Sequence, residues 1–202
     1  MRTAFYKIRA RSNLEGKWET AIVAVLLGFL VFAAIDIIFG KTYLSGGFFI
    51  FCLRLIFQGP ISLGMAMFFL ALSRRTNPEA SLIFKGFDNW ISAFFTMLLM
   101  IVFIILWAIL LIVPGIIAAL SYSMTLFILA DNPDLKPTEA IKRSRHMMQG
   151  HKSEFLKLIL SFIGWLFLSV ITCGILFILY VGPLYYATIT EFYESLQEIS
   201  DY

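Results

Sequence analysis

The feature that most constrains this chain is a series of long apolar runs that are almost free of charge. They cover residues 20–39, 50–73, 90–113, 115–130 and 156–190. A bilayer core about 30 Å thick needs about 20 apolar residues per helix, and every backbone amide must pair within the span. The sequence therefore predicts several membrane-spanning helices.

Composition supports this interpretation. The chain is 60% hydrophobic and 14% charged, whereas soluble domains are about 45–50% apolar and about 25% charged. This fraction of charged residues is too small to cover the water-facing surface of a soluble protein with so apolar a core. The first apolar run begins only near Thr20 and exceeds the roughly 7–15 apolar residues of a cleavable signal, so we expect it to be retained.

The last run is too long for one crossing. Its 35 residues would make a helix of over about 50 Å at 1.5 Å per residue. A break at Thr172-Cys173-Gly174 divides it into spans at 156–171 and 175–190, while Pro114-Gly115 opens the fourth span. The predicted fold is all-α: a single domain over residues 1–202, a polytopic membrane bundle of six transmembrane helices in three hairpins.

Basic residues indicate the orientation. With the N-terminus inside, fourteen of the 16 Lys and Arg residues fall in cytoplasmic segments, and only Lys41 and Arg54 lie outside or near the outer face. This asymmetry follows the positive-inside rule. A five-span alternative would place the tail at 191–202 outside, and that tail has no Lys or Arg to decide. We expect both termini in the cytoplasm.

A threefold pattern accompanies the hairpins. Gly16, Gly86 and Gly150 each precede a hairpin, and a Gly/Pro dipeptide lies in the second helix of each one: Gly59-Pro60, Pro114-Gly115 and Gly182-Pro183. The pattern predicts three units, each an amphipathic surface helix, a glycine and a hairpin. The alternative is that Gly and Pro are simply frequent in membrane helices.

The clearest surface helix is predicted at residues 137–150, between Pro137 and Gly150. Its apolar face comprises Ala140, Ile141, Ser144, Met147 and Met148. Lying in the headgroup plane, it would hold cations near anionic lipid. The candidate lipid or partner contacts are Lys142, Arg143, Arg145, His151 and Lys152. Alternatively, it is a solvated basic helix that only enforces orientation.

Several motifs resemble one known family. The central one runs over residues 107–117, 119–125 and 128–133, and further matches lie at Ile8–Arg11, Gly16, Trp18, Ala140-Ile141, Ser144, Met148, residues 150–152 and 160–165, and from Pro183 to residues 192–196. They are similar to the bacterial domain-of-unknown-function family nine-seven-five over nearly the whole chain. The resemblance implies an integral protein of the bacterial cytoplasmic membrane and supplies no catalytic residues.

Ionisable residues inside a membrane are costly, and here they are few. Asp36, late in the first predicted span, and Arg54, early in the second, both fall near the outer end. They form an intramembrane ion pair, or contribute to an ion or substrate site, or extend separately into the outer headgroups.

Other polar residues carry little sign of chemistry. Asp131 and Asp134 flank Asn132-Pro133, which suits a turn and a cap for the next helix better than a metal or phosphate site. His146 and His151 are five positions apart, which does not match the four-residue spacing of a helical zinc site. We expect no catalytic, cofactor or metal site and no nucleic-acid partner.

Three functions are compatible with this sequence. The first is a non-enzymatic membrane module that binds membrane lipids, a protein partner or a second copy of itself through its basic cytoplasmic face. The second is a small-solute transporter or channel with broken helices around a midplane site. The third is a lipid-modifying enzyme, for which no acid–base pair or metal cluster is visible.

Overall fold

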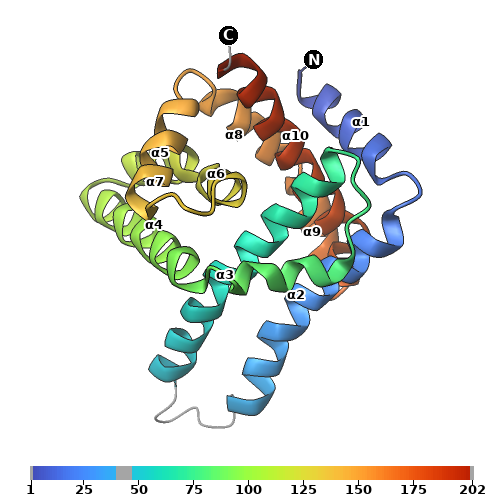
Figure 1. Cartoon of the computed structure of the whole chain (residues 1–202), viewed down its shortest axis with the longest axis horizontal. Helices are drawn as coiled ribbons and strands as arrows, with labels where there is room; N and C mark the ends of the chain where they lie inside the picture. Colours follow the sequence, from blue (N-terminus) through green and yellow to red (C-terminus); the bar gives the residue numbers. More distant parts are fainter. Residues whose placement is uncertain (1, 40–46, 201–202) are drawn as a thin grey trace.

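The computed structural model describes residues 2–39 and 47–200, with side chains described at all of these except 2, 36, 38, 39, 47–52, 199 and 200. In this part of the chain every regular element is a helix. In order they are α1 (Arg2–Leu14), α2 (Trp18–Phe39), α3 (Gly47–Ser73), η1 (Ala80–Phe87), α4 (Trp90–Leu110), α5 (Ile112–Tyr122), α6 (Thr125–Asp131), α7 (Pro137–Met147), α8 (Lys152–Leu160), α9 (Ile163–Ile171), η2 (Phe177–Val181) and α10 (Gly182–Ser200). The all-α prediction is confirmed (Figure 1).

Five helical segments are long and apolar enough to cross a membrane. They are Trp18–Ile35, Leu53–Ser73, Trp90–Leu110, Ile112–Asp131 and Lys152–Ile171. The segment in α3 is 61% buried inside the protein, whereas the segment in α4 is only 17% buried. The helix α3 therefore forms the centre of the bundle, and α4 presents most of its apolar side chains outward.

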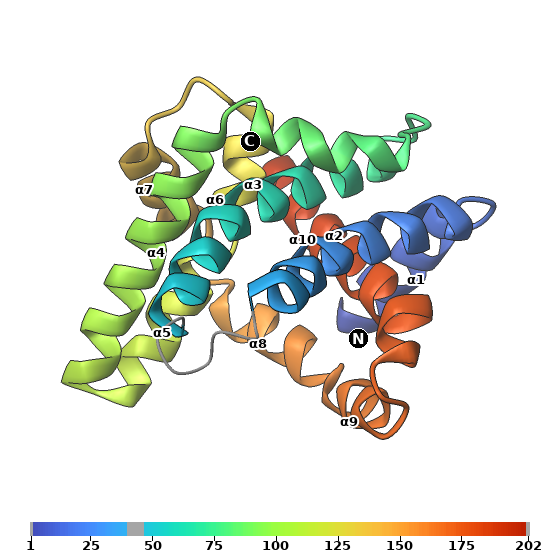
Figure 2. The same ribbon diagram turned by 90° about the horizontal axis from the view of Figure 1, so that it is seen from below.

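The outward apolar surface is concentrated at two hairpin tips. One is the turn between α4 and α5, where Ile109 and Ile112 are 79% and 75% exposed. The other is the turn after α9, where Val170 is 77% exposed. Figure 2 shows both turns at the lower edge of the molecule, away from α7 and η1. Contiguous apolar surface of this kind is rare on proteins surrounded by water.

The sixth predicted span has a different character. Residues 175–190 fall on the π-helical turn η2 and the first half of α10, which is not among the five candidate spans. The stretch from Val181 to Leu184 and again from Ala187 to Tyr193 is buried. Within this buried stretch, hydroxyl groups such as Thr188 Oγ1 donate to the helix backbone. Six full crossings therefore remain a prediction.

Two of the three Gly/Pro dipeptides share one structural role. A Cβ atom at Gly59 would lie 2.5 Å from the carbonyl oxygen of Ala93, and one at Gly115 would lie 2.8 Å from Ala108. At Gly182 it would lie 2.8 Å from the carbonyl oxygen of Phe177. Gly59 and Gly115 thus mark close approaches to α4, whereas the Gly182 contact lies within the helical turn that ends at this residue. The helix α3 continues through Pro60, so α3 is not a broken helix at this point.

The predicted surface helices are present, but the second unit departs from the other two. Gly16 follows α1 and Gly150 follows α7 with φ of +74° and +81°, the left-handed conformation that glycine adopts without strain. Gly86 instead lies inside the 3-10 helix η1, where an added Cβ would meet the Pro60 carbonyl oxygen at 2.0 Å. Gly16 and Gly150 therefore share a conformation that is absent at Gly86, and the threefold hairpin pattern stays a prediction.

The helix α7 lies where the sequence predicts it, but its apolar face contacts protein. Ala140, Ile141, Ser144 and Met148 are buried, and Ser144 Oγ donates to the Ser121 carbonyl oxygen at 2.9 Å. The expectation of an apolar face immersed in headgroups is therefore wrong for these four residues. The charged residues on the opposite side of α7 are left exposed.

Candidate functional site

The predicted pair of Asp36 and Arg54 lies partly outside the described residues. The side chain of Asp36 lies outside the described residues, and Arg54 is exposed on α3. Their pairing stays a prediction. The charged groups that the structure does bring together lie at the opposite end of the helices.

Arg74 is the centre of that cluster, directly after the last residue of α3. Its Nη1 and Nη2 donate to Oδ1 and Oδ2 of Asp131 at 2.7 and 2.8 Å, a bidentate arrangement that suits a planar guanidinium. Its Nε donates to Glu194 Oε1 at 2.9 Å. These neighbours raise the pKa of Arg74 above its ordinary value, chiefly through the hydrogen bond to Asp131.

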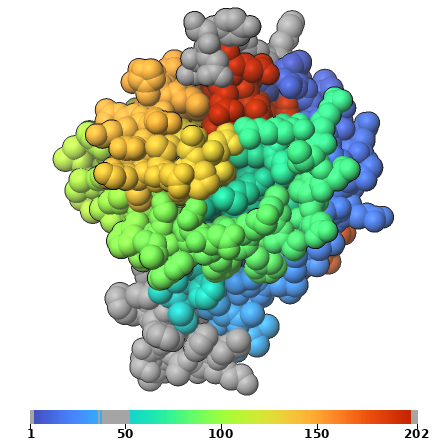
Figure 3. Space-filling view, in the orientation of Figure 1, coloured from blue at the N-terminus to red at the C-terminus, as the bar shows by residue number. Residues whose placement is uncertain are grey.

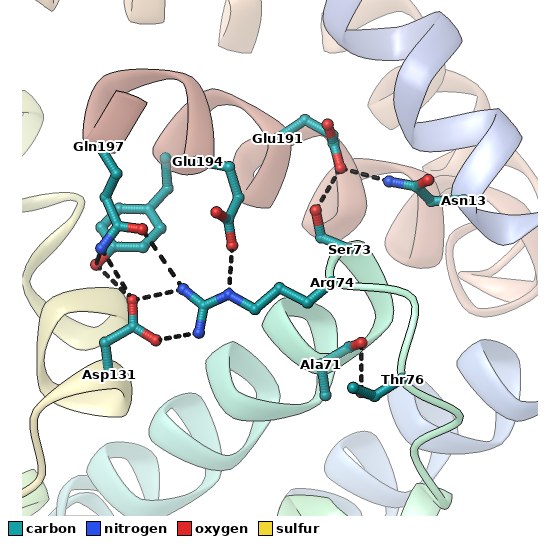
Figure 4. Close-up of polar contacts among 10 residues, drawn as sticks. Asn13, Ala71, Ser73, Arg74, Thr76, Asp131, Glu191, Glu194 and Gln197 are labelled. Atoms are coloured by element: carbon teal, nitrogen blue, oxygen red, sulfur yellow. Dashed lines mark hydrogen bonds and ion pairs between the residues drawn. The ribbon is translucent and has the colours of Figure 1, made fainter. Parts of the chain in front are cut away.

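Two neutral side chains of α10 complete the coordination of Asp131. Tyr193 Oη donates to Asp131 Oδ2 at 2.9 Å, and Gln197 Nε2 donates to the same oxygen at 3.1 Å. Figure 4 shows Arg74, after α3, and Gln197, on α10, both directed at the Asp131 carboxylate. Burial is the largest cause of the raised pKa of Tyr193, followed by the charge of Asp131, so its phenol stays protonated.

The cluster joins the three predicted hairpins. Arg74 follows the second helix of the first hairpin, Asp131 ends the second helix of the next, and Glu194 lies on α10 of the third. One cation thus links two carboxylates from different units. We call Arg74, Asp131, Tyr193, Glu194 and Gln197 the Arg74 cluster.

A second polar contact attaches α1 beside it. Glu191 is 1% exposed, and its Oε1 accepts hydrogen bonds from Ser73 Oγ and Asn13 Nδ2, both at 2.5 Å. Arg9 Nε lies 3.0 Å from Glu191 Oε2, close enough for ionic attraction but without the alignment of a hydrogen bond. Because Ser73 precedes Arg74, the two groups of contacts meet at the end of α3 (Figure 4).

Sequence reasoning missed most of this arrangement. From the sequence alone, Arg74 is only one of many predicted cytoplasmic cations, and Asp131 is predicted to be a turn residue. The turn is present, with the Leu135 amide donating to the Asn132 carbonyl oxygen at 3.1 Å. The predicted cap is wrong: the residue that precedes α7 is Lys136, and it makes no side-chain capping bond. The sequence did contain one signal for this cluster. Residues of opposite charge, namely Arg74, Asp131 and Glu194, lie at or near the ends of the second helices of the three predicted hairpins.

The five predicted basic contacts divide into separate groups. Lys142 and Arg143 line a hollow of about 490 Å³ together with His146. Arg145 and Lys152 line another, of about 180 Å³, beside Trp107 and Pro114. The fifth, His151, has its Nδ1 at 3.9 Å from Glu154 Oε2. Figure 3 shows α7 in orange on the same face as η1 and α10. The predicted basic contacts therefore border two different hollows.

A third hollow, of about 420 Å³, lies between α3, α5, α6, α8 and α10. Its lining is mainly apolar, with the hydroxyl-bearing residues Ser62, Ser123, Tyr185 and Tyr186. None of its lining residues is Asp, Glu, Lys, Arg or His. Ser62 and Tyr186 also line a smaller hollow of about 150 Å³ toward α2, so these two residues separate two spaces. For metals, the described residues include no group of three His, Cys, Asp or Glu that could hold an ion.

Comparison with known proteins gives one result. The family model described as "Protein of unknown function" matches the chain over residues 2–121 and 108–200. No curated protein and no solved structure matches it.

Proposed function

Because the chain belongs to the DUF975 family, whose description names no activity, its function must come from its own residues, and we propose that it is a non-enzymatic membrane module. It spans the cytoplasmic membrane of a bacterium several times, with both termini in the cytoplasm. Its basic cytoplasmic face binds anionic membrane lipid or a protein partner.

The observation that carries this proposal is the contrast between two sets of charges. Arg74 forms ion pairs with Asp131 and Glu194 inside the protein. Lys142, Arg143 and Arg145 are exposed on α7, and among the described residues no ion pair involves them. Cations held on one side without internal partners attract anionic surfaces within about 10 Å, the screening length at 0.1 M salt.

The packing of α7 against neighbouring helices also supports the proposed binding surface. Its buried side packs against α4, α5 and α6, so its cations project from a fixed surface. A helix that only oriented the chain would not need four buried residues and a buried hydrogen bond from Ser144. Fixed cations also lose less conformational entropy when they bind.

Crosslinking in cells tests the proposal. A photoreactive residue at exposed Gln149 should capture a lipid or a protein. Reversing Lys142, Arg143 and Arg145 to Glu should abolish that product, whereas reversing exposed Arg75 and Lys85 should not. Unchanged capture by the first variant, at equal abundance and topology, would refute the proposal.

A small-solute transporter is the second candidate, supported by the hollow that contains Ser62 and Tyr186. Its apolar lining with scattered hydroxyl groups suits a neutral, largely apolar solute and does not suit an ion. Substituting Ser62→Leu would fill the boundary between the two hollows. Liposomes containing the unsubstituted protein would have to move such a solute faster than Ser62→Leu liposomes do; equal rates would remove this candidate.

A further inference from the structure

The hollow beside Lys142 is enclosed by helices from two of the three hairpins and by α7. It measures about 490 Å³, and its polar lining comprises Asn132, Lys142, Arg143, His146, Tyr193 and Gln197. The volume exceeds what a single phosphate group fills, and lies in the range of small-molecule sites, about 300–1,000 Å³. The hollow is therefore large enough for a phosphate together with a small attached group.

One wall of the hollow is strongly cationic. Lys142, Arg143 and His146 all come from α7, within little more than one turn. Arginine offers a planar fork that matches phosphate oxygens, and lysine adds a compact charge. Buried Ala140 and Ser144 on the other side of α7 hold this wall in place.

The opposite wall belongs to the Arg74 cluster. Tyr193 and Gln197 line the hollow while their hydrogen atoms point to Asp131. The charge of Asp131 is in turn compensated by the two hydrogen bonds from Arg74. An anion in the hollow would thus meet the neutral side chains of Tyr193 and Gln197 on this wall.

We infer that this hollow binds a phosphate group, with Lys142 and Arg143 as the main contacts and His146 beside them. The inference rests on the proposed function and makes it specific, because it assigns one chemical class and one site to the basic face. The phosphate belongs either to the headgroup of an anionic phospholipid or to a small soluble phosphate compound.

Binding to the detergent-purified full chain distinguishes these sources. The probes are dihexanoyl-phosphatidylglycerol, dihexanoyl-phosphatidylcholine and inorganic phosphate, each titrated by calorimetry below the micelle concentration of the lipid. Tighter binding of the phosphatidylglycerol than of inorganic phosphate assigns the site to a lipid headgroup. Binding of inorganic phosphate at least as tightly assigns it to a soluble phosphate.

Matched variants locate the site. The double variant Lys142→Gln/Arg143→Gln should bind the preferred probe at least tenfold more weakly. Arg75→Gln/Lys85→Gln removes the same charge elsewhere and should bind normally. Equal affinity of the two variants, or no binding of any probe by the unsubstituted chain, would overturn the inference. Failure of this inference does not refute the proposed function, because crosslinking from Gln149 can still capture a protein partner through Arg145 and Lys152.

Discussion

Arg74 and Asp131 form a two-bond fork, at 2.7 and 2.8 Å, across 57 positions of sequence. The fork joins the end of α3 to the end of α6, and Glu194 extends it to α10. This contact joins the three predicted hairpins at the end opposite the apolar tips. A short loop, residues 132–136, connects Asp131 at the end of α6 to α7.

The geometry of the fork predicts that arginine is required at this position. Arg74→Lys keeps the charge but loses the planar donors, and we expect it to lower the free energy of unfolding by about 1–2 kcal/mol, a value reduced for the partial exposure of Arg74. Thermal denaturation in detergent measures the change. Arg75→Lys, at the exposed neighbouring position, is the control, and equal melting temperatures for the two variants would contradict the role of the fork.

The buried carboxylate of Glu191 gives a second prediction. Glu191→Ala leaves Asn13 and Ser73 without their hydrogen-bond acceptor and Arg9 without its ionic partner, and we expect a loss of about 2–3 kcal/mol. Glu198→Ala on the exposed side of α10 should cost little. Limited proteolysis should also cut α1 faster in the Glu191 variant, because α1 loses its polar attachment. Unchanged cleavage of α1 would show that apolar packing alone holds it.

Close backbone packing gives a third prediction. A Cβ atom at Gly64 would lie 1.8 Å from the Ile83 carbonyl oxygen, so η1 would have to move away from α3. We expect Gly64→Ala to destabilise the protein by about 1–3 kcal/mol. Gly164 in α9 has nothing within 4 Å of its Cβ position, and Gly164→Ala should leave the melting temperature unchanged or slightly higher. A larger loss of stability in Gly164→Ala than in Gly64→Ala would contradict the close packing of η1 against α3.

The pH dependence of stability provides a fourth. Burial raises the pKa of Glu194 above its ordinary value of 4.5, despite the opposing effect of Arg74. The unfolded chain therefore loses this proton at lower pH than the folded protein. The contribution of Glu194 to stability is present below about pH 4.5 and is lost as the pH rises through its folded pKa.

Melting curves of the unsubstituted chain and Glu194→Gln check the sign. The melting temperature of the unsubstituted chain minus that of Glu194→Gln should fall between pH 4 and pH 7. A difference that rises over this interval would mean that Arg74, and not burial, controls the carboxyl group.

The sequence predicts the elements of this fold better than their contacts. Apolar runs locate α2 to α4 and the α8–α9 segment, because an isolated helix in lipid needs only length and low charge. The break at Thr172-Cys173-Gly174 is observed, with Cys173 and Gly174 both at positive φ. The spacing of Ala140, Ile141 and Ser144 identifies the apolar side of α7, although not what covers it.

The contacts between distant residues could not be predicted from one sequence. Arg74 and Glu194 are separated by 120 positions, and the family resemblance at residues 192–196 does not indicate which residue Glu194 contacts. Positive-inside counting treats every cytoplasmic cation alike, so it does not separate Arg74, which has internal partners, from Lys142, which faces outward. That separation appears only when helix ends are brought together in space.

The most direct measurement of the central claim is the sidedness of α7. A chain with Cys52 and Cys173 replaced by Ser and Lys142 replaced by Cys would be labelled with a membrane-impermeant maleimide. We expect modification in inverted membrane vesicles and none in intact spheroplasts, as a basic face in the cytoplasm requires. Rapid labelling of position 142 in intact spheroplasts would contradict the orientation and, with it, the binding surface assigned to α7.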